Sequence, residues 1–319
     1  MEIEHKPLIT VIVPMYNSGN YIKRCITSLQ RQDFSFFCVL LIDDGSTDCT
    51  RELCERVCSE DKRFIYVYQE NAGVGGARNK GISLVRTPYL CFLDSDDEML
   101  PHSLSCFSAK IGNESLVVGG IEKNGIKISP KPKKINGKND IIETLYSESY
   151  FMNIVWGKLF NTEIIINRKI QFDDFSYGED TCFIYKYVNC IKKVEFIDDS
   201  IVKVNEVEGS LSTKKIKNSW DMVFRIWKLA YVLFPNNRII LQKILLRCIK
   251  TSLILNYKNN SFISDFTKIK NDLQKCDSIF LKNSKDLNLY DNVILWLTKR
   301  EFIRGILFII WIRCRFFGV

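Results

Sequence analysis

The sequence predicts an α/β fold in which a doubly wound, mainly parallel sheet is covered by helices on both faces. Within the first 112 residues, short apolar runs alternate with segments of helical periodicity. These runs are continuously apolar, as in strands buried on both sides, and polar residues follow several of them directly. The 319 residues are 46% hydrophobic and 26% charged, which excludes a disordered chain. No uncharged apolar stretch reaches about 18 residues, which excludes a polytopic membrane protein.

Each element of this region has its own signal. Leu8–Val13 is a β-rich run that Pro14 is expected to end. Apolar residues at helical spacing predict a helix over Gly19–Gln32, and the apolar run Val39–Ile42 predicts the second strand. Ser46 begins a candidate cap for a helix that extends to Ser59. The next strand, helix and strand follow at Phe64–Tyr68, Val74–Val85 and Tyr89–Leu93.

The remaining chain is expected to complete this domain and to end in helices. Residues 113–140 are rich in Lys, Gly and Pro, with one apolar strand at Leu116–Val118, and we expect an irregular excursion there. Residues 141–212 mix helix and strand patterns, and from Lys215 the periodicity is helical. The chain is therefore divided into 1–112, 113–214 and 215–319.

Polar loops follow three of the predicted strands. Their sequences are Pro14-Met15-Tyr16-Asn17, Asp43-Asp44-Gly45-Ser46 and Asp94-Ser95-Asp96-Asp97. Ligands of doubly wound sheets bind beyond the carboxyl ends of the strands. We therefore expect these loops to converge in space.

The acidic residues of these loops each allow two interpretations. Asp94 and Asp96, at positions i and i+2, can share a divalent cation that bridges to phosphate oxygens, or they can form an acidic turn that caps a helix. Their place at a strand end favours the cation site. Asp44 can accept a hydrogen bond from a nucleobase N–H or a ribose hydroxyl, or it can belong to a type I turn that begins with Asp.

Two further segments carry candidate site residues. The glycine-rich run Asn71–Asn79 is not a dinucleotide fingerprint, because Arg78 stands where the third glycine would be and the run follows the third strand. It predicts a turn into a helix whose N-terminal amides and Arg78 face an anionic ligand. Glu179 and Asp180 precede the amphipathic segment Thr181–Cys190, which suits either helix capping or base catalysis.

Taken in order, these segments resemble glycosyltransferase family 2, whose members have the GT-A fold. The resemblance covers about residues 8–215. It implies a nucleotide-sugar-binding half over 1–112, a mixed half over 113–214 that binds the acceptor and carries the base, and a helical C-terminal region. The segments that carry it are Thr10–Asn17, Leu41–Asp48, Glu70–Asn79, Phe92–Asp97, Trp156–Phe160 and Gly178–Asp180.

The resemblance implies that a sugar of hexosyl or N-acetylhexosaminyl type moves, with inversion, from a nucleotide-sugar, usually UDP-linked, to a saccharide hydroxyl in cell-surface polysaccharide synthesis. Asp180 would be the general base, supported by Glu179. Asp94 and Asp96 would hold Mn²⁺ or Mg²⁺. The residues implied in donor binding are Pro14, Tyr16, Asn17, Asp44, Asn71, Arg78, Asp94 and Ser95.

One segment departs from the family pattern. Gly209, Ser210 and Ser212 match the Gly-Ser-x-Ser sequence of the family. The Tyr- and Arg-rich segment before that sequence usually contributes to the loop that closes over the diphosphate, but here Asn205 and Val207 stand where its arginines are expected. The substitute charge could come from Lys203, Lys214 or Lys215. The alternative function is therefore a catalytically weak member that binds sugar nucleotides or membranes within a polysaccharide assembly complex.

The C-terminal segment 299–316 suggests contact with a membrane. Its apolar run Ile306–Ile312 is about 10 Å long as a helix, too short to span a bilayer. Basic flanks and Trp311 favour a helix lying in the lipid interface, and the alternative is a helix packed on the catalytic domain. We expect a cytoplasmic protein peripheral to the inner face of the cell membrane, with a lipid-linked saccharide acceptor and no nucleic acid partner.

Overall fold

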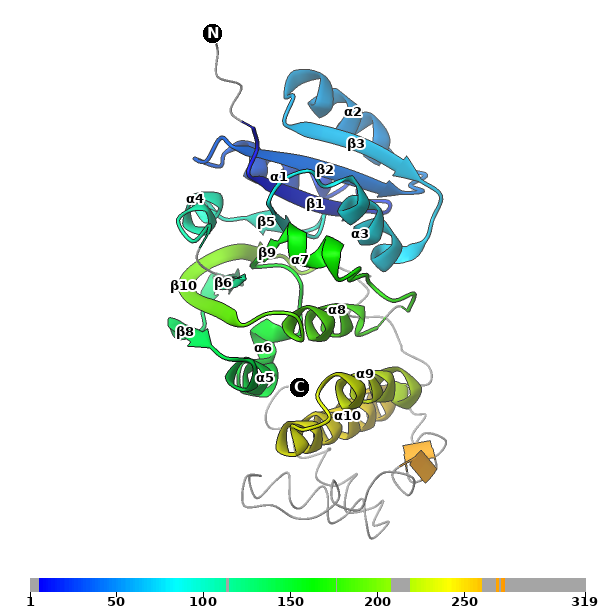
Figure 1. Cartoon of the computed structure of the whole chain (residues 1–319). Coiled ribbons are helices and arrows are strands. Elements are labelled where there is room, and N and C mark those ends of the chain that lie inside the picture. Colours follow the sequence, from blue (N-terminus) through cyan, green and yellow to red (C-terminus); the bar gives the residue numbers. More distant parts are fainter. Residues whose placement is uncertain are drawn as a thin grey trace. The chain divides into compact units, whose positions relative to one another are not determined.

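The computed structural model describes residues 6–112, 115–175, 177–207 and 219–259, with two short helical pieces at 268–269 and 271–272. Contacts divide the chain into two compact units, Met1–Glu208 and Gly209–Val319 (Figure 1). The first unit contains the sheet and every predicted site residue.

The first unit is built on one sheet, which has ten strands in the described residues. Its order is β3-β2-β1-β4-β9-β6-β10-β5, with β7 on β6 and β8 on β10. Both predicted halves of the domain thus contribute to the same sheet. The strands are β1 Ile9–Met15, β2 Phe37–Asp44, β3 Phe64–Gln69, β4 Tyr89–Phe92, β5 Glu98–Met99, β6 Leu116–Lys123, β7 Ile126–Ile128, β8 Lys133–Asn136, β9 Lys158–Asn161 and β10 Lys193–Val204.

The first four strands form the predicted parallel half. β1 pairs in parallel with β2 and β4, and β2 pairs in parallel with β3. The connecting helices are α1 Ile22–Gln30, α2 Thr50–Glu60 and α3 Gly73–Leu84. β1 continues through Pro14, beyond its predicted end. This is tolerated because the pairing of β1 with β4 stops at Ile12, so the missing N–H of Pro14 removes no bond on that side.

Helix α3 approaches β1 closely at Gly81. A Cβ atom added there would lie 2.5 Å from Cγ2 of Ile12, which is fully buried. Gly81→Ala is therefore expected to lower the free energy of unfolding by about 1–2 kcal/mol, because overpacking outweighs the gain in helix propensity. Urea denaturation measures this change. Ser83→Ala, at an exposed position of the same helix, is the control, and a Gly81→Ala midpoint equal to that of the control would contradict this close packing.

The irregular excursion predicted over residues 113–140 is wrong, although the strand predicted at Leu116–Val118 falls within β6. The segment contains β6, which lies inside the sheet between β9 and β10, together with the edge strands β7 and β8. Gly119 and Gly120 interrupt the apolar pattern of β6 because there is no space for side chains. A Cβ at Gly119 would lie 2.3 Å from Ile201, and one at Gly120 would lie 2.3 Å from Ser129.

Aromatic side chains fix helix α8, Glu179–Val188, against the sheet. Phe183 of α8 stacks on Phe172 with ring centroids 4.2 Å apart, and it meets Phe92 of β4 and Phe160 of β9 edge-on. This packing holds the N-terminal end of α8 beside the carboxyl end of β4. The other helices of the unit are α4 Ser103–Ser108, α5 Lys138–Ser147, α6 Ser149–Met152 and α7 Thr162–Asn167.

The second unit contains helices α9, Ser219–Leu233, and α10, Arg238–Asn259. They pack together through side chains such as Trp227, whose indole N–H donates to the carbonyl of Leu241 at 3.1 Å. Among the described helices, none is both long enough and apolar enough to cross a membrane. The helix predicted over 299–316 to lie in the lipid interface falls outside the described residues, as do Lys214 and Lys215.

Candidate active site

The three polar loops meet at the carboxyl edge of the parallel strands, as the sequence predicts. The backbone N–H of Asn17 donates to Ser46 Oγ at 2.9 Å, and Asn17 Oδ1 accepts from the N–H of Thr47 at 2.8 Å. The hydroxyls of Ser18 and Ser95 lie 2.8 Å apart. Asn17 thus joins the loop after β1 to the loop after β2, and Ser95 joins the loop after β4 to the loop after β1.

Asp44, at the end of β2, is a buried carboxylate of this edge. Its Oδ1 accepts from Gln69 Nε2 at 2.6 Å and from the N–H of Ala72 at 2.8 Å, and its carbonyl accepts from Asn71 Nδ2 at 2.9 Å. Among the described residues, Oδ2 has no hydrogen-bond donor, so it can accept one from a ligand. Pro14, near the end of β1, pairs with Ile42 of β2. Tyr16 is the first residue after β1, and it exposes 54% of its surface.

The loop after β4 is fixed through its backbone. The carbonyl of Asp96 accepts from Arg24 Nη2 at 2.5 Å and from Asn205 Nδ2 at 3.1 Å. The N–H of Asn205 donates to Asp97 Oδ1 at 2.9 Å. Asn205, which replaces an expected arginine, therefore binds the acidic loop itself. Lys203, one of the proposed substitutes, pairs with Glu98 at 3.1 Å.

Arg78 of α3 connects this loop to helix α8. Its Nη2 donates to Asp94 Oδ1 at 2.9 Å, and its Nη1 donates to Asp180 Oδ1 at 2.6 Å and to Glu179 Oε1 at 3.4 Å. The side chain is only 4% exposed. Burial by itself would lower the pKa of Arg78, but the three carboxylates outweigh burial and raise it. The sequence predicts that Arg78 faces an anionic ligand, whereas its guanidinium is occupied by these protein carboxylates.

Asp180 lies in the first turn of α8, which Gly178 opens with a φ of 82°. Burial raises the pKa of the Asp180 carboxyl to about 7, with Arg78 opposing this shift and the charges of Glu179 and Asp94 adding to it. A carboxyl with a pKa near neutrality is suited to accept a proton at physiological pH.

The acidic loop fits a divalent cation that is shared with a ligand. Burial, together with the charge of Asp94, raises the pKa of Asp96, so a positive charge between these carboxylates would be stabilising. In the described part of the chain, no three His, Cys, Asp or Glu side chains are grouped as a metal site. Mg²⁺ is commonly bound by one or two carboxylates together with phosphate oxygens, and Asp94 and Asp96 suit that arrangement.

The sequence also matches a known family. A sequence model described as Glycosyl transferase family 2 matches residues 10–178. The match includes the edge loops and Arg78, and it ends at Gly178, directly before α8. The chain belongs to glycosyltransferase family 2. The prediction of the family from its motifs is confirmed, and so is the predicted α/β fold of GT-A type.

Relatives of this family 2 glycosyltransferase include GlyA of Streptococcus pneumoniae, 31% identical over 219 residues, which are 64% of this chain and 31% of GlyA. The chain thus spans about a third of that relative. Residues 1–349 of TarS from S. aureus, solved in complex with UDP-GlcNAc, superpose with a TM-score of 0.72 at 21% identity, covering 94% of this chain and 89% of that one. A mannosyltransferase from Pyrobaculum calidifontis, solved with GDP-Man and Mn²⁺, gives a TM-score of 0.57 at 14% identity, over 95% and 87% of the two chains.

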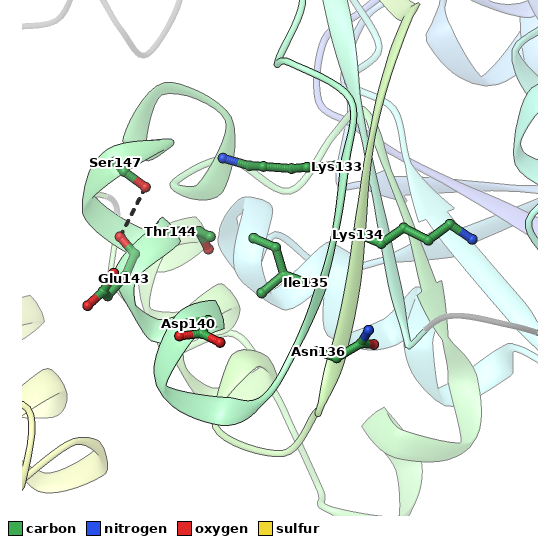
Figure 2. Close-up of a pocket in the computed structure, with 8 residues that line it drawn as sticks. All are labelled: Lys133, Lys134, Ile135, Asn136, Asp140, Glu143, Thr144 and Ser147. Carbon is green, nitrogen blue, oxygen red and sulfur yellow. Dashed lines mark hydrogen bonds between the residues drawn. The ribbon is translucent and has the colours of Figure 1, made fainter.

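Several contributors to the site are missed by the sequence analysis. Gln69, which holds Asp44, and Arg24, which holds the acidic loop, belong to ordinary strand and helix patterns and carry no local signal. A cavity of about 440 Å³ between β8 and α5 contains none of the predicted site residues (Figure 2). It is lined by Lys133, Lys134, Ile135, Asn136, Asp140, Glu143, Thr144 and Ser147.

Proposed function

We propose that the protein is an inverting glycosyltransferase that moves a sugar from a UDP-linked donor to a hydroxyl of a saccharide acceptor in bacterial cell-surface polysaccharide synthesis. The observation that carries the proposal is the position of Arg78, whose guanidinium binds both Asp94 of the acidic loop and Asp180 of α8. One residue thereby joins the carboxylate assigned to the donor diphosphate to the carboxylate assigned to the acceptor hydroxyl.

The nucleotide would bind over the edge formed by β1 and β2. The free Oδ2 of Asp44 would accept a hydrogen bond from the base, and the exposed ring of Tyr16 would pack against it. Pro14, Asn17, Asn71 and Ser95 would shape this pocket through the contacts of their loops. Support for a UDP-sugar comes from TarS, whose structure holds UDP-GlcNAc.

Asp94 and Asp96 would hold Mn²⁺ or Mg²⁺, and the mannosyltransferase that was solved with Mn²⁺ supports this assignment. When bound, the cation supplies positive charge that stabilises the leaving diphosphate. Arg78, which is buried against Asp94, would hold that carboxylate in place instead of contacting the donor.

Transfer requires one base and no covalent intermediate. Asp180 would accept the proton of the acceptor hydroxyl while that oxygen bonds to the anomeric carbon of the donor. The bond from the anomeric carbon to the diphosphate breaks on the opposite side, and its electron pair leaves with the diphosphate, so the configuration inverts. Arg78 and Glu179 would keep Asp180 oriented, with Arg78 also stabilising its ionised form.

The second candidate function is a catalytically weak member of a polysaccharide assembly complex that binds sugar nucleotides or membranes. Asn205 motivates it, because Asn205 bonds to the acidic loop instead of presenting a charge to a diphosphate. The lipid-linked acceptor and the membrane location rest on the segment 299–316 alone. Turnover of UDP-sugars by purified protein with Mn²⁺ separates the two functions, since the weak member would bind the donor without transferring its sugar.

The cation assignment predicts a loss of metal-dependent binding. Asp96→Asn is expected to weaken the affinity for UDP in the presence of Mn²⁺ by about tenfold or more, which is about 1.4 kcal/mol. Calorimetric titration with UDP, with and without Mn²⁺, measures the change. Glu55→Gln, which removes an exposed carboxylate of α2 that pairs with Arg51, is the matched control. An unchanged response to Mn²⁺ in Asp96→Asn would refute the assignment.

A further inference from the structure

Lys158, the first residue of β9, is a buried cation to which no role has been assigned. It is 1% exposed, and its ammonium donates to the carbonyl of Phe151 at 2.5 Å and to that of Trp156 at 3.4 Å. No carboxylate among the described residues forms an ion pair with it. Burial lowers the pKa of Lys158 to about 7, and the charge of Asp180 acts in the opposite direction. A buried cation held only by carbonyls is costly, which points to a function in this place.

We call the segment of residues 153–157 the support turn. The Phe151 carbonyl lies before this segment and the Trp156 carbonyl lies within it. Phe151 belongs to α6, a helix of four residues, and its carbonyl is among those that have no partner within the helix. Asn153 Nδ2 also donates to the carbonyl of Ser149 at 2.5 Å. Lys158 therefore closes the support turn by bonding to the helix before it and to a carbonyl within it.

The support turn contacts the helix that carries Asp180. The backbone N–H of Val155 faces the Asp180 carboxylate and acts to lower its pKa. Thr181, the next residue of α8, donates through Oγ1 to the carbonyl of Asn153 at 3.2 Å. Trp156 forms a parallel β-bridge with Phe92 of β4, two residues before Asp94. The support turn is thus held between the acidic loop and the base.

We propose that Lys158 is a positioning residue that holds the support turn so that the N–H of Val155 orients the Asp180 carboxylate toward the acceptor hydroxyl. The inference rests on the proposed function, in which Asp180 is the base. The other charged groups that face Asp180 are Arg78 on α3, Glu179 on α8 and Asp94 after β4. Lys158 acts through the backbone of the support turn, because a residue without a donor at this position would leave the carbonyls of Phe151 and Trp156 unpaired.

The test replaces Lys158 with Met, which has a similar length and no donor. Lys158→Met is expected to lower kcat by about tenfold or more while KM for the donor and the affinity for UDP stay within about twofold. The acid limb of the pH–kcat profile is expected to move to higher pH, because a loosened Val155 N–H stabilises the ionised carboxylate less. The number of UDP sites from calorimetry corrects kcat for unfolded protein.

Lys133→Met is the matched control, because Lys133 binds at the other end of the same short helix. Its ammonium pairs with Glu148, which precedes α6 (Figure 2 shows Lys133 on β8). The control is expected to keep the kcat and the pH profile of the original protein. A folded Lys158→Met variant whose kcat and pH profile equal those of the original protein would overturn the proposal. A residue with a purely structural role would change the stability of the protein, but it would not change turnover per folded site.

A second variant keeps the proposal testable if Lys158→Met does not fold. Thr181→Val removes the bond to Asn153 without uncovering a charge, and it is expected to lower kcat severalfold at unchanged UDP affinity. An unchanged kcat would overturn the positioning role. Failure of the proposed function is recognised separately, because Asp180→Asn would then keep its activity whatever the variants of the support turn do.

Discussion

Asp180→Asn is expected to lower kcat by about 10²-fold or more while the affinity for UDP stays unchanged. Asparagine preserves the size of the side chain and its bond to Arg78, but it cannot accept the proton of the acceptor hydroxyl. Because burial raises the pKa of Asp180 to about 7, activity of the original protein should rise with pH through that value as the base ionises. Rates of sugar transfer at saturating donor, measured across pH, report both effects.

Glu179→Gln is the control for this change. Glu179 lies 3.4 Å from Arg78, compared with 2.6 Å for Asp180, so its loss should reduce kcat less. If Glu179→Gln were inactive and Asp180→Asn nearly normal, the two roles would be exchanged. If both variants kept normal turnover, the base would lie elsewhere.

Arg78→Met is expected to lower the free energy of unfolding by about 3–5 kcal/mol, the range found when one partner of a buried ion pair is removed. Asp94, Asp180 and Glu179 would then repel one another without a compensating cation. Burial raises the pKa of Asp180 to about 7, so protonation of Asp180 at acidic pH relieves part of this repulsion, and the loss should be smaller at pH ~5 than at pH ~8. Denaturant titrations at the two pH values measure it.

Two further variants sharpen the test of Arg78. Arg78→Lys should recover only part of the stability, because one ammonium lacks the forked geometry that reaches Asp94 and Asp180 from two nitrogens. Arg86→Met, which changes an exposed arginine shortly after the same helix, should leave stability within about 0.5 kcal/mol. An equal effect of Arg78→Met and Arg86→Met would show that the carboxylates of the site do not depend on Arg78.

The parallel half of the fold could be predicted from the sequence because its signals are local. Continuous apolar runs such as Val39–Ile42 are long enough to identify buried strands, and helical spacing between them identifies the crossovers. The alternation of strands and helices also predicted that Asn17, Ser46 and Ser95 would converge, because the carboxyl ends of parallel strands lie at one edge of the sheet. The motifs at these ends were sufficient to identify the family.

The second half could not be predicted in the same way. Gly119 and Gly120 weaken the strand pattern of β6, and the reason for them lies in Ile201 and Ser129, which approach β6 too closely for side chains. Whether a glycine-rich segment is a buried strand or a loop therefore depends on partners distant in the sequence. The role of Asn205 could not be predicted for the same reason, because it binds Asp96 of the acidic loop, which lies 109 residues earlier in the sequence.

By itself, the sequence determined the doubly wound half, the acidic loop and the pair Glu179 and Asp180 as site candidates, because each is encoded in a few consecutive residues. Only the tertiary structure decided how they are connected. Arg78 meets Asp180 across 102 residues, and Lys158 closes the turn whose Val155 N–H reaches the same carboxylate. These contacts depend on burial, because a cation removed from water needs polar or charged partners nearby. The fold brings those partners from distant parts of the sequence, so no local sequence pattern predicts them.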